Sequence, residues 1–180
     1  MRKVIHKVFW AWQAEKEEAW LNEMSAMGLA LVAVGFCRYE FEDCTPGEYQ
    51  YRIELLKYVP THPESQQYIK FIEDTGAEQI GSYMRWVYFR KKAADGPFDL
   101  FSDLTSRITH LTRIISLLVS LSIFNAGAAI YNLIIAFGFP SVINGIAGGL
   151  SIAVEIPLLI GIFKLNTKRN KLKKDQKIFE

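Results

Sequence analysis

Hydrophobic and polar positions divide the chain into two parts with different patterns. Residues 1–113 mix charged and apolar side chains, whereas residues 114–163 contain one charged side chain, Glu155. Two apolar runs, residues 114–137 and 142–163, fill the second part. A helix rises about 1.5 Å per residue, so each run is long enough to cross a hydrocarbon core of about 30 Å. The pattern predicts two transmembrane helices. Two buried helices of a soluble protein are disfavoured, because so short a chain cannot enclose both.

The short uncharged connection at residues 138–141 predicts that the two apolar helices form an antiparallel hairpin. Basic residues flank this hairpin on both outer sides: Lys91, Lys92, Arg107 and Arg113 before it, and Lys164, Lys168, Arg169, Lys171, Lys173, Lys174 and Lys177 after it. Since basic residues mark the cytoplasmic side, we expect a multi-pass protein of the cell membrane with both termini cytoplasmic. The basic tail, residues 164–180, is expected to contact anionic lipid. A nucleic-acid-binding tail is the less favoured alternative, and we expect no direct binding of nucleic acid.

Residues 1–94 show the periodicities of a cytoplasmic α+β domain. Alternating apolar and polar positions predict strands at residues 3–10, 29–43 with a break at Gly35, 49–55, 77–83 and 85–91. Helical spacing predicts a helix over residues 12–27 and a second helix that starts at a capping box in residues 61–64 and ends at Gly76. The N-terminal segment has no apolar stretch long enough for the core of a signal peptide, so we expect the domain to stay in the cytoplasm.

A weak internal repeat runs through this domain at an offset of 48 residues. Each half reads as a helix, a glycine stop and a pair of strands. The aligned positions are Trp20, Leu21, Met24, Gly28, Val32, Tyr39 and Phe41 in the first half and Tyr68, Ile69, Ile72, Gly76, Ile80, Val87 and Phe89 in the second. Two such halves predict a ferredoxin-like βαββαβ antiparallel sheet with two helices on one face, followed by the all-α transmembrane hairpin.

Between the domain and the hairpin, residues 95–113 predict an amphipathic linker helix. Its apolar positions Phe101, Leu104, Ile108 and Leu111 recur at helical spacing. A helix that runs straight into the first span would couple the domain rigidly to the bilayer. A signalling linker and a passive tether share this pattern, so both interpretations stay open.

Glu155 belongs to a polar face in the predicted hairpin. Gly145, Gly148, Ile152 and Glu155 share one face of the second helix, and Ser122, Asn125, Ala129 and Asn132 share one face of the first. In a hairpin that is symmetric about its turn, residue numbers at equal depth add up to about 277, which pairs Ser122 with Glu155, Asn125 with Ile152, Ala129 with Gly148, and Asn132 with Gly145. Gly149 completes a GxxxG pair with Gly145.

These residues predict close helix packing and a polar clasp around Glu155, either within one hairpin or between protomers. A carboxylate at this depth, about 13 Å of helix rise from Lys164, is expected to be protonated or hydrogen-bonded inward. A proton-linked or ion-linked role for Glu155 is the alternative.

Candidate catalytic chemistry is sparse. His6, His62 and His110 fall in separate predicted elements, and no metal, nucleotide or nucleophile motif is present in the sequence. Cys37 and Cys44 do not have the spacing of a zinc or redox motif and are expected to be ordinary reduced cysteines. The acidic residues Glu15, Glu17, Glu18 and Glu23 are interpreted as one solvated helix face. We therefore expect no enzyme activity, no catalytic residue, no metal and no cofactor.

Several segments resemble a known bacterial family. They are WLNEMSAMG at residues 20–28, CRYEFE at residues 37–42, EYQYRI at residues 48–53, and FIEDTG through WVYFRK within residues 71–91. Over residues 3–92 the chain resembles the domain-of-unknown-function family DUF2812. The resemblance implies a cytoplasmic domain followed by membrane spans, encoded in many cases beside a PadR-type transcriptional repressor. It implies a regulatory setting and no catalytic residue or ligand.

Together these observations predict a membrane-anchored protein-interaction or signalling module. Its expected partners are membrane lipid, other copies of itself in a homo-oligomer, and an unidentified cytoplasmic protein, for which a PadR-like transcriptional regulator is the favoured candidate. An accessory subunit of a membrane transporter is the alternative, motivated by the polar helix face and Glu155.

Overall fold

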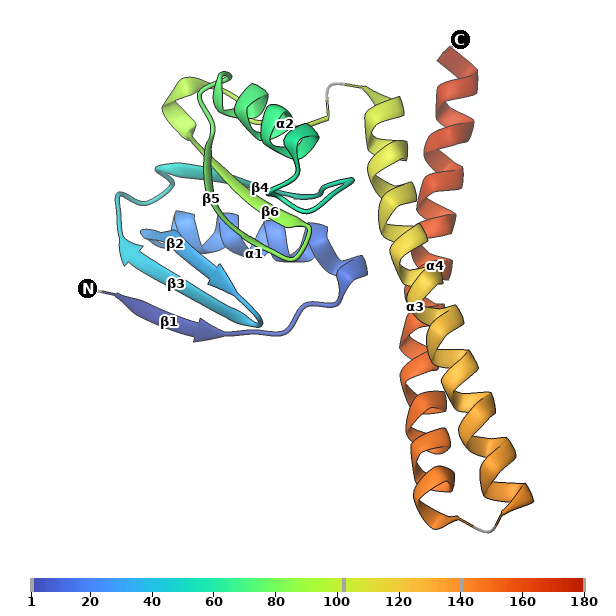
Figure 1. The fold of residues 1–180 in the computed structure, drawn as a ribbon. Helices are drawn as coiled ribbons and strands as arrows, with labels where there is room; N and C mark the ends of the chain where they lie inside the picture. The colour runs from blue at the N-terminus through green and yellow to red at the C-terminus, as the bar shows by residue number, and fades with distance from the viewer. Residues whose placement is uncertain (1, 102, 140, 180) are drawn as a thin grey trace. The chain divides into compact units, whose positions relative to one another are not determined.

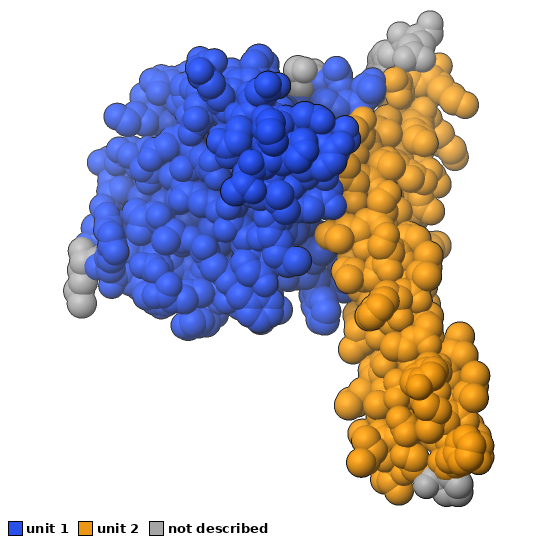
Figure 2. All heavy atoms as spheres, in the orientation of Figure 1, with its two compact units in different colours: residues 1–106 blue, residues 107–180 orange. Residues whose placement is uncertain are grey.

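The structure, a computed structural model, describes residues 2–101, 103–139 and 141–179. The chain forms two compact units, Met1–Ser106 and Arg107–Glu180 (Figure 2). The first unit mixes helices and strands, and the second is helical.

The first unit contains six strands and two α-helices among its described residues (Figure 1). In chain order they are β1 (Lys3–His6), α1 (Ala14–Ala26), β2 (Leu29–Gly35), β3 (Arg38–Asp43), β4 (Tyr49–Leu55), α2 (Pro63–Glu73), β5 (Glu78–Tyr83) and β6 (Trp86–Lys92), with short 3-10 turns η1 (Ala11–Gln13) and η2 (Ala93–Asp95). The strands form two antiparallel sheets, ordered β1-β3-β2 and β4-β6-β5. The α+β class is as expected, but a ferredoxin-like single sheet is not confirmed.

The two sheets are copies of one βαββ arrangement. In each half the first strand pairs with the last, which also pairs with the strand after the helix. The pairing register slips at matching places, between Leu31 and Ala33 in β2 and between Gln79 and Gly81 in β5. These irregularities are separated by the 48 residues of the sequence repeat. The repeat in the sequence is therefore a repeat of strand pairing as well as of side-chain type.

Two helix-ending glycines mark the same point in each half. Gly28 and Gly76 have φ of +81° and +86°, a left-handed conformation that glycine adopts without steric cost. A Cβ added at Gly28 would lie 3.1 Å from the Cys44 carbonyl oxygen, so this position excludes a side chain for a second reason.

Two apolar cores fill the first unit, and they lie on opposite faces of the β4-β6-β5 sheet. In β6, Tyr88 packs in the core beneath α1, whereas its neighbours Val87 and Phe89 pack in the core beneath α2. Successive side chains of a strand point to opposite faces, so helices must cover both faces of this sheet. The expectation of both helices on one face was wrong, and the unbroken apolar run of β6 is the physical reason.

The core beneath α1 joins both sheets. Its buried members are Trp20, Leu21 and Met24 of α1, Leu31 of β2, Tyr39 and Phe41 of β3, Tyr51 and Ile53 of β4, and Tyr88 of β6. The sheets also meet where β2 runs beside β5. A Cβ added at Gly81 would lie 3.1 Å from Val34 Cγ1, so the missing side chain permits this close approach.

Element boundaries differ from the sequence expectation in three places. The first strand ends at His6, where residues 3–10 were expected to be extended. Helix α2 is capped by His62, whose Nδ1 accepts from the Glu64 backbone N–H at 3.2 Å, and not by Thr61. The linker helix was expected from residue 95, but the helix starts at Leu104. Phe98 lies before it, buried in the core beneath α2, where its N–H donates to Gln50 Oε1 at 3.0 Å.

The second unit is an antiparallel pair of long helices, α3 (Leu104–Gly138) and α4 (Val142–Phe179) (Figure 1). Helix α3 contains part of the predicted linker and the whole first apolar run. Helix α4 continues from the second apolar run through the basic segment, which the sequence pattern had distinguished as a tail. Pro157 lies inside α4 without ending it.

Both helices are long and apolar enough to cross a membrane. In their most apolar 18-residue windows, only 22% of α3 and 11% of α4 is buried. A core helix of a soluble protein buries most of such a window, so the exposed apolar surface disfavours that alternative.

Candidate functional site

A polar clasp joins the two long helices around Glu155. The Ser122 hydroxyl and the Asn125 amide, both on α3, donate hydrogen bonds to the two carboxylate oxygens of Glu155 on α4, the second at 2.8 Å. Asn125 Nδ2 also donates to the Ser151 carbonyl oxygen at 2.8 Å. The structure thus brings Glu155, Ser122 and Asn125 together within one chain, with Glu155 as the acceptor.

Close packing continues from the clasp toward the turn of the hairpin. A Cβ added at Gly148 would lie 2.9 Å from Leu133 Cδ2 and 3.6 Å from the Ala129 carbonyl oxygen. Gly145 faces Ala136, whose Cβ is 3.9 Å from a Cβ added there. Small residues at these positions therefore set the approach of α4 to α3.

Asn132 and Gly149 do not make the contacts with the opposite helix that the sequence predicted. The Asn132 amide donates to the Ala128 carbonyl oxygen of its own helix, and Ala136 takes the expected place of Asn132 opposite Gly145. A Cβ added at Gly149 would meet no atom within 4 Å. Gly149 is one residue beyond Gly148, about 100° further around the helix, which turns it away from the α3 contact.

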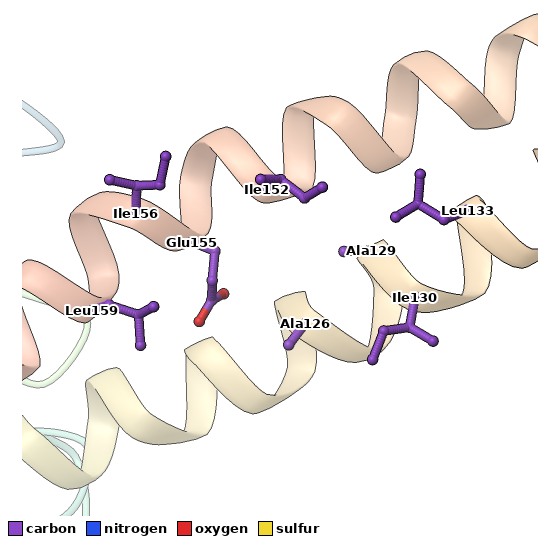
Figure 3. A pocket seen from close by; sticks show the side chains of 8 residues that line it. All are labelled: Ala126, Ala129, Ile130, Leu133, Ile152, Glu155, Ile156 and Leu159. Carbon is purple, nitrogen blue, oxygen red and sulfur yellow. The ribbon is translucent and has the colours of Figure 1, made fainter.

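A groove of about 370 Å³ opens beside the clasp. It is lined by Ala126, Ala129, Ile130 and Leu133 of α3 and by Ile152, Glu155, Ile156 and Leu159 of α4 (Figure 3). Glu155 is the one polar side chain among these lining residues, and it points from α4 toward α3 (Figure 3).

The basic residues predicted to face lipid all lie on α4. Lys164, Lys171, Lys173 and Lys174 are exposed, whereas Lys168 and Arg169 are partly buried. Arg169 also donates to the Asn166 side-chain oxygen. Four of the six side chains are therefore accessible on the surface of α4, and Arg169 is engaged along its own helix.

The first unit holds a buried carboxylate that the sequence pattern missed. Glu17 is only 8% exposed, and its Oε1 accepts from the Tyr39 hydroxyl at 2.7 Å and the Tyr88 hydroxyl at 2.6 Å. Burial raises the pKa of Glu17 above 4.5, although both hydroxyl donors oppose that rise. Burial and the neighbouring carboxylate also raise the pKa of each tyrosine.

The interpretation of Glu17 as part of a solvated helix face was wrong. It precedes Trp20 and Leu21 by three and four residues, so it lies on the buried stripe of α1. This spacing could have identified Glu17 as a buried residue from the sequence alone. What the sequence did not supply was the pair of tyrosine hydroxyls, which come from strands 22 and 71 residues further along.

Polar side chains of α1 pair with the exposed backbone edge of β4. Ser25 donates to the Tyr49 carbonyl oxygen at 2.7 Å and accepts from its N–H at 3.2 Å. Asn22 accepts from the Tyr51 N–H at 2.9 Å and donates to its carbonyl oxygen at 3.2 Å. Glu18 accepts from the Ile53 N–H at 3.1 Å. Helix α1 thus replaces a neighbouring strand at this edge, which an unprotected sheet leaves open to other chains.

A family model described as a protein of unknown function, DUF2812, matches residues 13–123. The chain belongs to the DUF2812 family. The match includes most of the α+β unit and continues into α3, beyond the residues 3–92 expected from the sequence segments. Comparisons with curated proteins and with solved structures give no match.

In this DUF2812 protein the segment at residues 20–28 has a definable structural role. Trp20, Leu21 and Met24 enter the core beneath α1, while Asn22 and Ser25 bond the β4 edge. Gly28 then ends the helix in a left-handed conformation. Six of the nine residues are therefore tied to burial, edge pairing or helix termination.

Within the described residues, no three His, Cys, Asp or Glu side chains lie close enough together to hold a metal ion. Cys37 and Cys44 are free thiols, as expected.

Replacing Glu17 by glutamine is expected to flatten the pH dependence of stability of the α+β unit. The folded unit holds the Glu17 proton to higher pH than the unfolded chain does. The free energy of unfolding therefore falls as pH rises from about 4.5 to the raised pKa, by about 1.4 kcal/mol for each tenfold difference in proton affinity. Glutamine does not ionise in this range, so that part of the fall disappears.

Urea unfolding of full-length protein in detergent at pH 4–8, followed by tryptophan fluorescence, measures this effect. All four tryptophans lie in the first unit, at Trp10, Trp12, Trp20 and Trp86, so the signal reports that unit alone. Glu23→Gln, at an exposed position of the same helix, is the matched control. Equal pH slopes for wild type and Glu17→Gln would contradict the prediction.

Proposed function

We propose that this protein is a membrane-anchored interaction module whose α+β unit binds a cytoplasmic protein, with a PadR-like transcriptional regulator as the favoured partner. The observation that carries the proposal is an exposed apolar patch on a folded unit whose chain continues into two apolar helices. A partner held by the first unit is thereby held at the membrane.

The patch lies where two β-hairpins turn. We define the hairpin-tip patch as Phe36, between β2 and β3, together with Tyr83, the last residue of β5, and Met84, in the turn between β5 and β6. Phe36 is 74% exposed and Met84 is 73% exposed, and the rings of Phe36 and Tyr83 lie 5.6 Å apart. Turns favour glycine and small polar residues, so the geometry of these turns does not explain the presence of large apolar side chains. Aromatic residues and methionine are enriched in protein interfaces.

The helix pair is proposed to be a multi-pass anchor of the cell membrane with both termini cytoplasmic. Exposed lysines on the last part of α4, among them Lys164, Lys171 and Lys174, support this orientation and contact with anionic lipid. Open space at Gly149 leaves room for a helix of a second chain, in support of a homo-oligomer.

Replacing both Phe36 and Met84 by serine is expected to abolish capture of the cytoplasmic partner. The measurement is a crosslinked pull-down of tagged full-length protein from membranes of its native host, with recovered proteins identified by mass spectrometry. Phe71→Ser, which removes a side chain 63% exposed on α2, is the matched control and should leave capture intact. A regulator recovered with wild type and lost with the double variant supports the proposal. Recovery unchanged by the double variant would contradict it.

A second candidate function is an accessory subunit of a membrane transporter. The clasp around Glu155 and the adjoining groove favour it, because polar residues inside membrane helices are rare and often functional. In the same pull-down, transporter subunits retained by the hairpin-tip variant and lost with Gly148→Val would support this candidate over the first.

A further inference from the structure

Residues 7–12, between β1 and α1, hold apolar side chains outside the core. Phe9 anchors the segment, because its ring centroid lies 5.6 Å from that of Trp20 and 6.3 Å from that of Tyr39 in the core beneath α1. The side chains on either side of Phe9 stay exposed, Val8 by 67% and Trp10 by 50%. Neighbouring apolar side chains left exposed often mark an interaction surface.

Trp10 is held in place although half of its surface is exposed. Its ring stacks on that of Trp12, with centroids 5.0 Å apart and 12° between the planes. Its backbone N–H donates to Gln13 Oε1 at 3.1 Å, and its carbonyl oxygen accepts from the Gln13 N–H at 2.7 Å. The segment therefore presents a preorganised pair of indole rings, which lowers the entropy lost on binding.

The exposed charges in this part of the chain are mainly basic. Arg2 forms an ion pair with Glu42. The other exposed charged side chains within residues 2–16 are three lysines and one glutamate: Lys3, Lys7, Lys16 and Glu15. A basic surface with exposed indole rings is complementary to the cytoplasmic face of a bilayer, where anionic headgroups attract lysine and tryptophan lies at the interface.

The chain keeps the folded unit close to the proposed bilayer. Phe98 is buried in the core beneath α2, and the first apolar run begins at Ile114. The residues between them include the first turns of α3 from Leu104, so they extend over at most about 35 Å. A surface on this unit therefore meets lipid at a high effective concentration, an advantage that a dissolved partner lacks.

We propose that residues 7–12 form a lipid-binding surface, with Val8, Trp10 and Trp12 at the interface of the bilayer and the neighbouring lysines against anionic headgroups. This surface rests on the membrane placement proposed above, and it adds a bilayer-binding face to a unit that the helix pair only tethers. The Lys7 N–H donates to the Cys37 carbonyl oxygen at 3.1 Å, so the surface begins next to the hairpin-tip patch.

Tryptophan quenching by brominated lipid tests the proposal in full-length protein reconstituted into vesicles of phosphatidylcholine and phosphatidylglycerol. Residues 107–180 contain no tryptophan, so quenching reports contact of lipid with the first unit. We expect quenching of about half of the emission, since two of the four tryptophans lie in the segment. In the double variant Trp10→Phe, Trp12→Phe, the emission of the remaining tryptophans is expected to be unquenched. Trp86 lies two residues beyond Met84, so quenching that survives in this variant would place the hairpin-tip patch on lipid and overturn the proposal.

A second variant keeps all four tryptophans. Val8→Asp places a charge in the surface, so it is expected to remove most of the quenching. Val59→Asp, at a position 51% exposed in the loop before α2, is the matched control and should be quenched as wild type is. Vesicles without phosphatidylglycerol are expected to quench wild type less, because they lack the anionic headgroups.

Absence of quenching in wild type overturns the proposal, and it is the result expected if a protein covers this surface instead. Equal quenching of the two aspartate variants, or equal quenching by vesicles with and without phosphatidylglycerol, also overturns it. Resistance of the protein to carbonate extraction from the same vesicles reports insertion of the helix pair separately. A failed lipid surface is thereby distinguished from a failed membrane anchor.

Discussion

Replacing both Asn22 and Ser25 by alanine is expected to lower the free energy of unfolding of the α+β unit by about 3–5 kcal/mol. The two side chains are hydrogen-bond partners of the N–H and carbonyl groups of Tyr49 and Tyr51 at the β4 edge. The Tyr51 carbonyl oxygen also accepts from Arg52, so the double variant removes the side-chain partners of the other three groups. Ser25 is 1% exposed, so water has little access to replace it. Each buried polar group left without a partner costs about 1–3 kcal/mol. A loss of this size removes much of the roughly 5–15 kcal/mol that stabilises a typical domain.

Urea unfolding followed by tryptophan fluorescence measures the loss in full-length protein. Glu23→Ala, an exposed position between the two on the same helix, should change stability by less than about 0.5 kcal/mol. The vacated β4 edge should also pair with other chains, so concentration-dependent association is expected from the double variant. A double variant as stable as Glu23→Ala would show that α1 does not satisfy this edge.

Local pattern was enough to predict most elements of the α+β unit. The strands β2, β3 and β4 lie where the alternation of apolar and polar residues and the break at Gly35 predicted them. Both signals are local, because strand alternation and a glycine turn depend on residues close together in the sequence. The 48-residue repeat was visible because each half carries the same helix, glycine and strand pair. The sequence did not reveal that the halves form separate sheets. That choice depends on which strand β1 and β4 join, and those partners are 30 or more residues away.

The candidate sites differ in how many of their residues could be predicted from the sequence. The sequence could predict the pairing of Ser122 with Glu155 and of Ala129 with Gly148. In a symmetric hairpin, the depth of a residue in the membrane and the helix face on which it lies are enough to identify its partner. Glu17 was misjudged because residue type was given more weight than position, although its spacing from Trp20 placed it in the core stripe. The pairing of Asn22 and Ser25 with β4 depends on a helix crossing a strand edge, which no local pattern encodes.

Replacing Gly148 by valine is expected to separate α4 from α3 near the clasp, whereas Gly149→Val is expected to have little effect. A Cβ at Gly148 would lie 2.9 Å from both Cγ and Cδ2 of Leu133, and valine adds two methyl groups beyond it. Leu133 can rotate away from one added atom, but a branched side chain requires the helices to move apart. Overpacking of this kind costs about 1–3 kcal/mol. Gly149 has open space, so its variant is the matched control.

A disulfide across the hairpin provides the readout. Ala136→Cys and Gly145→Cys, in a background with Cys37 and Cys44 replaced by serine, place two thiols on Cβ positions 3.9 Å apart. That separation is within the range of about 3.5–4.5 Å for disulfides. We expect near-complete oxidation of this pair in detergent-solubilised protein, slowed about tenfold by Gly148→Val, the factor that 1.4 kcal/mol represents, and unchanged by Gly149→Val. Equal slowing by both valine variants, or by neither, would show that Gly148 does not set the helix contact. The clasp and the groove depend on that contact. A difference in oxidation rate between Gly148→Val and Gly149→Val would therefore support the geometry of both.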